Sequence, residues 1–330
     1  MITPPPDRAR RLLLCVDAPS LLHRHHHARS GTGLTDQGGR PAWALHGMLR
    51  QILDAIDRFA PDAVVFGLDD RTHSTRRELY PDYKAGRAEK APALVEQLER
   101  AGSLLAALGL ATLTPPGLEA DDVSASAAAW ASAHGWDCVL VTSDRDVFAH
   151  ISEHTSVLRL IDGGIDGSPL LTPAKVRTMY GVGPEQYLDY AALRGDASDH
   201  LPGVRGIGEK TAALLLTVAG TMRAAWADID HAEGRHLAAA LDDWCDDAGV
   251  RRVGAAVVGR LTAPGAREQF DLNQLVMTAH TDLELPLTPD VPGSPGMLPI
   301  DIDRVVRVVG HLGVQATTDV AARVLSAVPG

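Results

Sequence analysis

The sequence predicts an α/β fold in which helices flank a mainly parallel sheet. Continuous apolar runs over residues 11–17, 62–69 and 136–144 have the length and composition of buried strands. Apolar residues recur at helical spacing over residues 42–59 and 92–110, which separate these runs. Strands that alternate with helices in this way form parallel sheets through right-handed crossovers. We therefore expect the three strands to end at one edge of the sheet.

The carboxyl end of each predicted strand carries an acid, and a second acid closely follows the third strand. These acids are Asp17, Asp69, Asp144 and Asp146. In open α/β sheets, ligands bind beyond the carboxyl ends of the strands. One acid at such a position is commonplace, whereas three strands that end alike indicate a shared site.

A further acidic group stands at a predicted helix start. The segment 115–117, Pro-Pro-Gly, ends the preceding element, and the small residues of 123–131 favour a helix. The helix dipole favours acids in a first turn, so alone they would need no other role. Beside three acidic strand ends, they instead extend a cluster that requires cations, and oxygen ligands favour Mg²⁺ or Mn²⁺. The acids of this helix start are Glu119, Asp121 and Asp122.

The segment 71–92 has a different composition, with six Arg and Lys residues and two tyrosines. A solvated charged loop is the plain interpretation, but loops of this length are unusual inside a compact domain. We interpret the segment as a mobile element that grips phosphate near the acids.

From residue 172 onward the pattern is helical, and proline follows Thr172 and Gly183 at two predicted helix starts. Asp196 and Asp199 lie between predicted helices. A glycine-spaced turn follows them and presents backbone N–H groups at the start of a helix over 211–218, a favourable position for phosphate. A connection without a ligand is the alternative, but these glycines bracket a basic residue. The turn comprises Gly203, Arg205, Gly206, Gly208, Lys210 and Thr211.

Composition limits the possible functions. The 330 residues, 45% of them hydrophobic, can bury a sizeable core. No apolar run approaches the ~18 residues of a membrane span, and we expect a cytoplasmic protein. The three cysteines are too far apart to suggest a zinc site or a disulfide framework. The net charge of −11 is unusual for a nucleic-acid binder, but nine candidate metal ligands contribute most of it.

Five motifs occur in order along the chain, and together they are highly specific. They are Leu-Cys-Val-Asp17, Tyr-Pro-Asp-Tyr-Lys84-Ala-Gly-Arg87, Gly-Leu-Glu119-Ala-Asp121-Asp122, Thr-Ser-Asp144-Arg-Asp146, and Gly-Asp196-Ala-Ser-Asp199 with the glycine turn. This set resembles the 5′-nuclease superfamily, specifically the bacterial 5′–3′ exonucleases or flap endonucleases and the N-terminal domain of DNA polymerase I. The resemblance covers about residues 11–290.

The resemblance implies a PIN-like (resolvase-like) nuclease core over residues 1–171, with a helical arch at about 71–95. It implies a helical region over 172–290 that contains a DNA-binding helix-three-turn-helix at about 190–218. Residues 291–330 are covered poorly and are expected to form a C-terminal extension. No polymerase domain follows in the sequence, so we expect a stand-alone form.

The resemblance also implies roles for individual residues. Lys84 and Arg87 would neutralise the scissile phosphate, and Arg24, Arg76 and the glycine turn would contact DNA. A first metal ion would be held by Asp17, Asp69, Glu119 and either Asp121 or Asp122, and a second would lie near Asp144, Asp146, Asp196 and Asp199. A K⁺ ion would bind the backbone carbonyls of Val204 and Ile207. His200 departs from the family, which usually has Asn at this position.

The implied function is two-metal hydrolysis of DNA phosphodiester bonds in replication and repair. The expected partners are DNA with a 5′ flap, nick or free 5′ end, and RNA–DNA primers; we expect a monomer without a membrane partner. Two other functions remain open at this point. A catalytically silent, structure-specific DNA-binding module would keep the fold, but would have no reason to crowd nine carboxylates. A PIN-type ribonuclease shares the acidic strand ends but lacks the helix-three-turn-helix.

Overall fold

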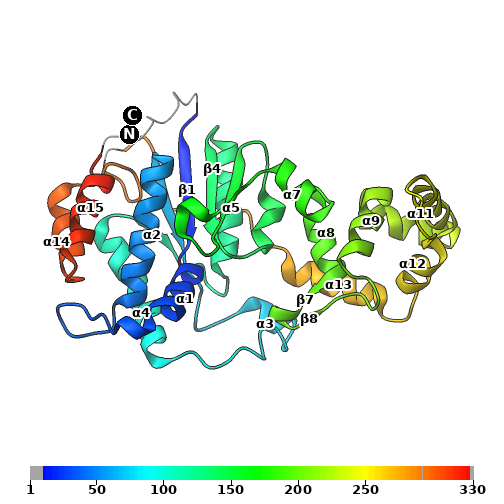
Figure 1. Cartoon of the computed structure of the whole chain (residues 1–330), viewed down its shortest axis with the longest axis horizontal. Coiled ribbons are helices and arrows are strands. Elements are labelled where there is room, and N and C mark those ends of the chain that lie inside the picture. Colours follow the sequence, from blue (N-terminus) through cyan, green and yellow to red (C-terminus); the bar gives the residue numbers. More distant parts are fainter. Residues whose placement is uncertain (1–9, 292, 328–330) are drawn as a thin grey trace.

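The computed structural model describes residues 10–291 and 293–327. Figure 1 shows a sheet enclosed by helices at one end of the molecule and an all-helical arm at the other. Within the described ranges, no helix alone has the length and hydropathy of a membrane span. Two neighbouring helices, Glu209–Ala219 and Met222–Ala232, reach these criteria only as a pair, and they meet at a bend of 75°.

The sheet confirms the three predicted strands and their parallel order. β1 (Leu12–Asp17) lies between β2 (Ala63–Gly67) and β4 (Asp137–Thr142). β3 (Ala111–Leu113) continues the sheet beyond β2, and β5 (Thr155–Arg159) continues it beyond β4. All four pairings are parallel, so the carboxyl ends of these strands share one edge. β3 has only three residues and had no strand signal in the sequence.

An antiparallel strand closes one side of the sheet. β6 (Leu170–Leu171) pairs with β5 in antiparallel register, with Leu171 opposite Val157. The short helix α6 (Gly164–Gly167) occupies the connection between them. This hairpin ends the strand order at the edge opposite β3.

Alternate residues of β1 serve opposite faces of the sheet. Leu13 and Cys15 join one buried apolar cluster, which includes side chains of α5 (Ala120–Ala133). Leu14 and Val16 join a second cluster, which the helices on the other face complete. Those helices are α1 (Ala18–Arg29), α2 (Trp43–Phe59) and α4 (Pro92–Leu108). Burial on both faces explains why the strand sequences are continuously apolar.

The helical arm is continuous with the part of the chain that forms the sheet. The buried cluster that includes α5 also contains Tyr187, Leu215, Leu241 and Phe270 of the arm. The predicted starts at Pro173 and Pro184 are confirmed. The helices of the arm are α7 (Pro173–Tyr180), α8 (Pro184–Arg194), α9 (Glu209–Ala219), α10 (Met222–Ala232), α11 (Arg235–Asp247), α12 (Gly254–Leu261) and α13 (Ala266–Met277).

The C-terminal segment packs on the core and is not a separate appendage. The N–H of Val64 in β2 donates to the carbonyl of Gly296 at 2.8 Å. The chain then forms α14 (Ile302–Gly310) and α15 (Gln315–Leu325). Val305 and Val309 of α14 are buried in the same apolar cluster as α2 and α4. Both helices therefore cover the helical layer on that face of the sheet (Figure 1).

The arch segment is less helical than predicted. It contains α3 (Thr75–Leu79), a turn at residues 81–86 and a stretch without regular secondary structure up to α4. Pro81 and Gly86 interrupt any longer helix, because proline and glycine are poor residues for a helix interior. Lys84 has a φ of +57°, which places it in the left-handed region within this turn.

Candidate metal centre and nucleic-acid interface

Asp17, at the carboxyl end of β1, is 5% exposed and held by two hydrogen bonds. Its Oδ1 accepts the N–H of Ser20 at 2.9 Å and so caps α1, while its Oδ2 accepts the hydroxyl of Thr142 at 2.7 Å. Burial, followed by the nearby charge of Asp69, raises the pKa of Asp17 to about 7. The Thr142 contact was not foreseen, although Thr142 is the last residue of the neighbouring strand.

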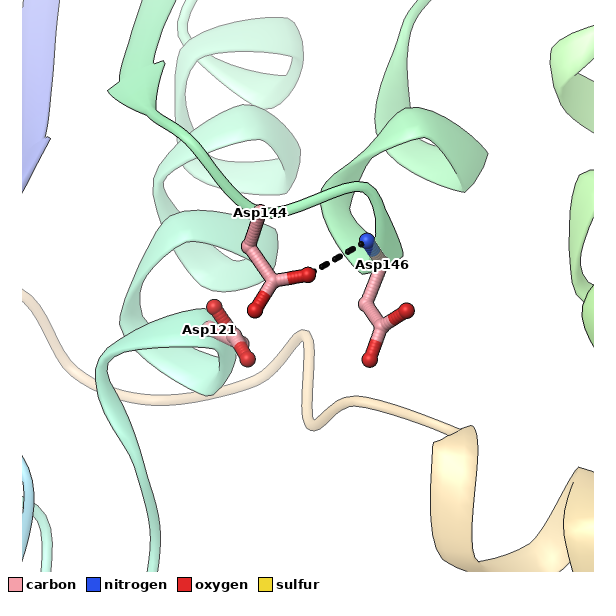
Figure 2. A group of neighbouring side chains, drawn as sticks. All are labelled: Asp121, Asp144 and Asp146. Atoms are coloured by element: carbon pink, nitrogen blue, oxygen red, sulfur yellow. Dashed lines mark hydrogen bonds between the residues drawn. The ribbon is translucent and has the colours of Figure 1, made fainter. Parts of the chain in front are cut away.

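Three acids from separate elements converge beyond the sheet (Figure 2). Asp121 comes from the first turn of α5, Asp144 follows β4, and Asp146 begins the 3-10 helix η2 (Asp146–His150). Each offers a carboxylate oxygen, and these oxygens lie within 4.8 Å of one another. The Oδ1 of Asp144 also accepts the N–H of Asp146 at 3.1 Å, which fixes the loop between them.

The electrostatics of this group fit divalent cations. Burial, followed by the charge of Asp144, raises the pKa of both Asp121 and Asp146 well above the usual value. Asp17 also raises the pKa of Asp121. Carboxylates that repel one another in a poorly solvated site are stabilised by a bound cation, and an all-oxygen donor set suits hard ions such as Mg²⁺ or Mn²⁺. The sequence-predicted cluster thus has the donor chemistry of a divalent metal centre.

Lys84 and Arg87 reach this acidic group from the arch. The Nζ of Lys84 lies 3.0 Å and 2.9 Å from the two carboxylate oxygens of Glu119, and 3.8 Å from Oδ2 of Asp199. Arg87 pairs with the other oxygen of Asp199. Burial alone would raise the pKa of Glu119, but Lys84 and then Arg76 outweigh it and leave this pKa below the usual value. Two cationic side chains therefore lie among the acids.

Two pockets flank Asp144 and connect the remaining predicted ligands. One has a volume of about 370 Å³ and is lined by Asp17, Asp69 and Asp121, together with Arg24. Asp69 is held there because its Oδ1 accepts the N–H of Ala120 at 3.0 Å. The predicted DNA contact Arg24 thus lies beside the acids, where its Nη2 donates to Asp162 at 2.8 Å.

The second pocket has a volume of about 590 Å³ and joins Asp144 to Asp196. Asp196 and Asp199 stand on a small antiparallel hairpin formed by β7 (Gly195–Asp196) and β8 (Leu201–Pro202). The Oδ1 of Asp196 accepts the backbone N–H of Ser198 at 2.7 Å. The hairpin thus places Asp196 in one pocket with Asp144, and Asp199 in a further pocket with Asp121 and Asp146.

The structure corrects the expectations for Arg76 and Asp122. Asp122 is fully buried, and both of its oxygens accept hydrogen bonds from Arg76, at 2.8 and 3.0 Å. The backbone N–H groups of Glu119 and His280 also donate to it, each at 2.9 Å. Arg76 is only 7% exposed and also donates to the carbonyl of Val276. This pair is an internal clamp, so Arg76 lies away from the DNA-accessible surface and Asp122 has no free oxygen for a metal.

The backbone conformation at residue 200 bears on the presence of His200 where the resembling family usually has Asn. His200 has a φ of +59° and a ψ of +28°, a left-handed conformation that Asn tolerates better than most residues. Its ring packs against Gly86 so closely that a Cβ at Gly86 would lie 2.0 Å from Cε1 of His200. This contact joins the turn of the arch to the hairpin. Tyr83 also supports the site, because its hydroxyl donates to Glu119 at 3.0 Å.

The glycine turn has the form of a phosphate-binding helix start. Gly203 lies against the backbone of Arg194, where a Cβ would approach the Arg194 carbonyl to 2.1 Å. Within the described chain, the N–H groups at the start of α9, from Glu209 to Thr211, have no hydrogen-bond partner. The Val204 carbonyl accepts the N–H of Ile207 at 2.9 Å. The exposed positions of this turn include Arg205, Gly206, Gly208 and Lys210.

The raised pKa of Asp17 predicts a stability difference that depends on pH. Below about pH 4 the carboxyl is protonated in both states, whereas between pH 4 and 7 the folded protein holds a proton that the unfolded chain releases. Folding stability due to this group is therefore lost as pH rises to about 7. We expect metal-free Asp17→Asn, measured by urea unfolding, to gain on the order of 2 kcal/mol over the wild type from pH 4 to pH 8. A pH-independent difference would contradict this.

Comparison with protein families gives two adjacent matches. Residues 12–181 match the N-terminal resolvase-like domain of 5′-3′ exonucleases, and residues 182–291 match the C-terminal SAM fold of the same proteins. DNA polymerase I of Mycobacterium tuberculosis strain H37Rv is 34% identical over 232 residues, which are 70% of this chain and 26% of the polymerase. The thermostable DNA polymerase I of Thermus aquaticus is 40% identical over 218 residues, or 66% of this chain and 25% of the polymerase. The chain thus spans about a quarter of these relatives.

Solved structures share the fold over nearly the whole chain. A bacteriophage T5 protein co-crystallised with metal ions has a TM-score of 0.62 at 18% identity and covers 96% of this chain and 100% of its own. A T5 flap endonuclease in a pseudo-enzyme-product complex with DNA and metal ions has a TM-score of 0.57 at 19% identity, with 96% and 98% covered. Since both domain matches lie in order over residues 12–291, the chain belongs to the 5′-3′ exonuclease family.

Proposed function

We propose that this chain is a structure-specific 5′ nuclease that hydrolyses phosphodiester bonds of DNA, as a 5′–3′ exonuclease and 5′-flap endonuclease in replication and repair. Its substrates are DNA with a 5′ flap, nick or free 5′ end, and RNA–DNA primers. It acts as a monomer in the cytoplasm. The observation that carries the proposal is the convergence of carboxylates at the sheet edge with Lys84 and Arg87 among them.

The acids divide into two sets that would hold two Mg²⁺ or Mn²⁺ ions. Such ions supply hydroxide from bound water at neutral pH and offset the charge of the leaving 3′ oxygen. Asp122 belongs to neither set, because its oxygens are engaged by Arg76 and by backbone N–H groups. The first set is Asp17, Asp69, Glu119 and Asp121; the second is Asp144, Asp146, Asp196 and Asp199.

Lys84 and Arg87 act on the scissile phosphate. In the metal-free protein they pair with Glu119 and Asp199, and these contacts hold both cations beside the acids. Substrate phosphate can replace the carboxylates as their partner once cations neutralise the acids. Their positive charges then stabilise the charge that develops on the phosphate oxygens.

The glycine turn and the start of α9 hold the duplex part of the substrate. Their exposed N–H groups, with Arg205, Lys210 and Thr211, bind the phosphate backbone without reading sequence. A K⁺ ion on the carbonyls of Val204 and Ile207 would add positive charge to the same turn. Because these contacts are ionic, affinity for DNA is expected to fall steeply with salt concentration.

A flap-cleavage assay tests the proposal. The wild type is expected to cleave a 5′-flap DNA with Mg²⁺, leaving 5′-phosphate ends, and Asp144→Asn is expected to slow single-turnover cleavage by about 10²-fold or more. Asn retains an oxygen that can accept the N–H of Asp146, so the loop geometry is preserved. An inert wild type with both Mg²⁺ and Mn²⁺, or an unimpaired variant, contradicts the assignment.

The same assay separates the two alternatives. A DNA-binding module would bind the flap substrate in a mobility-shift experiment without cleaving it. A PIN-type ribonuclease would prefer an RNA flap of the same sequence to the DNA flap. The glycine turn favours the DNA nuclease, because PIN-type ribonucleases lack this element.

A further inference from the structure

A group of basic side chains lines the pocket beside the metal centre and has no role in the reaction described so far. Lys90 from the arch and His23 and His27 from α1 line the 370 Å³ pocket that contains Asp17 and Asp69. In the described parts of the chain, neither Lys90 nor His23 has a hydrogen-bond or ion-pair partner, whereas Lys84 and Arg87 are paired with acids. Lys90 and His23 are therefore polar groups that remain free beside the site.

These side chains line the same pocket and influence one another electrostatically. Burial, followed by the charge of Lys90, lowers the pKa of His23 to about 4, and His27 and Arg87 add to this effect. Burial lowers the pKa of Lys90 as well, although the charge of Asp69 opposes it. Beside Lys84 and Arg87, which are paired with acids, Lys90 thus adds an unpaired amino group to the pocket, and His23 adds an imidazole that is uncharged at neutral pH and can donate an N–H. This combination suits an anion with several acceptor oxygens, such as phosphate.

The position of this basic lip, defined as Lys90, His23 and His27, indicates which phosphate it would contact. The 590 Å³ pocket leads from Asp144 toward Arg194 and Asp196, next to the glycine turn. The basic lip lies in the other pocket, and the two pockets share Ser143 and Asp144. Figure 1 shows α1 and α9 on opposite sides of the hairpin of β7 and β8. If the glycine turn holds the duplex, the strand beyond the scissile bond passes the basic lip.

We propose that the basic lip binds the phosphate one nucleotide to the 5′ side of the scissile phosphate. This inference rests on the proposed nuclease function and extends it to a specificity. In a flap that phosphate is an internal diester. At a recessed 5′ end from which one nucleotide is removed, it is the terminal 5′-phosphate. The enzyme therefore distinguishes a 5′-phosphate end from a 5′-hydroxyl end.

Three DNA substrates with the same duplex test this subsite. They have a recessed 5′-phosphate end, a recessed 5′-hydroxyl end, and a long 5′ flap, and single-turnover rates are measured with Mg²⁺. The wild type is expected to remove the first nucleotide about tenfold faster from the 5′-phosphate end, the effect of one charge-assisted contact. The flap has a diester at the same position, so it distinguishes an internal phosphate from a terminal one.

Substitutions in the basic lip should lower the cleavage rate only of substrates that carry this phosphate. Lys90→Ala, at an exposed residue, is expected to lower the ratio of 5′-phosphate to 5′-hydroxyl rates severalfold, and the double variant Lys90→Ala/His23→Gln should bring it close to one. Flap cleavage should fall by a similar factor, while the 5′-hydroxyl rate stays unchanged. Lys175→Ala, an exposed lysine outside both pockets, is the matched control and should keep the wild-type ratio.

Two outcomes would overturn the inference while leaving the nuclease function intact. The first is a ratio of 5′-phosphate to 5′-hydroxyl rates that is the same in the wild type, in Lys90→Ala and in the double variant. The second is an equal loss on all three substrates, which would indicate a general structural effect. An inert wild type on every substrate would instead reject the proposed function itself.

Discussion

Asp121→Asn is expected to lower flap cleavage by roughly 10³-fold or more, the largest effect of any single acid in the site. Asp121 lies between the two sets of ligands, because the charges of Asp144, Asp17 and Asp146 all raise its pKa. Its oxygen also belongs to the group of three within 4.8 Å. Neutralising it removes a ligand charge that both ions would experience. Single-turnover cleavage of a 5′-flap DNA with saturating Mg²⁺ measures this loss.

The loss should occur without loss of folding stability. Because like charges and burial raise the pKa of Asp121, removing its charge relieves repulsion in the metal-free protein. The melting temperature of metal-free Asp121→Asn should therefore equal or exceed that of the wild type, and its increase on adding Mg²⁺ should be smaller. Asp303→Asn is a matched control, since Asp303 is an exposed acid in the first turn of α14. If Asp121→Asn cleaves DNA at the wild-type rate, Asp121 is not a ligand of the metal centre.

The strand ends were predictable because local sequence determines them. A buried parallel strand requires a continuous apolar run, and the first polar residue after it marks the functional edge. Asp17, Asp69 and Asp144 could thus be assigned to one site before any contact was known. The small residues of 123–131 likewise predicted α5, whose close packing on β1, β2 and β4 directs Asp121 toward the strand ends.

Partner choice within the site could not be predicted, since it depends on contacts between distant segments. Glu119, Asp121 and Asp122 have the same carboxylate chemistry within four positions of the chain. Only the approach of Arg76 from the arch, and of the N–H of His280 from the chain after α13, makes Asp122 structural and leaves Asp121 free. Arg76 could not be distinguished from the other basic residues of its segment, because the sequence does not show which of them is buried.

The packing of the C-terminal segment could not be predicted for a related reason. The apolar face of α14 is narrow, with Val305 and Val309 one turn apart, and such a face does not identify the helices that it contacts. The layer that it covers, formed by α2 and α4, comes from more than 190 residues earlier in the chain. Its packing against those helices joins residues 302–325 to the domain that contains the sheet.

Arg76→Ala is expected to destabilise the protein by about 3–5 kcal/mol, the cost of breaking a buried ion pair from one side. The variant would leave the charge of Asp122, which is fully buried, with only two backbone N–H donors. It would also remove the donor to the Val276 carbonyl. Urea unfolding of the metal-free protein measures the change, and cleavage should also fall because the arch loses its anchor on α5.

Arg77→Ala is the matched control, since Arg77 is the next residue of α3 but is exposed, and its Nε donates only to the Tyr83 carbonyl at 3.3 Å. Its substitution should change the free energy of unfolding by about 1 kcal/mol or less. Adding Asp122→Asn to Arg76→Ala should recover part of the lost stability, because the unpaired charge is the main penalty. Equal stability of Arg76→Ala and Arg77→Ala would mean that the clamp is open in solution, and that the arch is attached to α5 by Tyr83 and Lys84 alone.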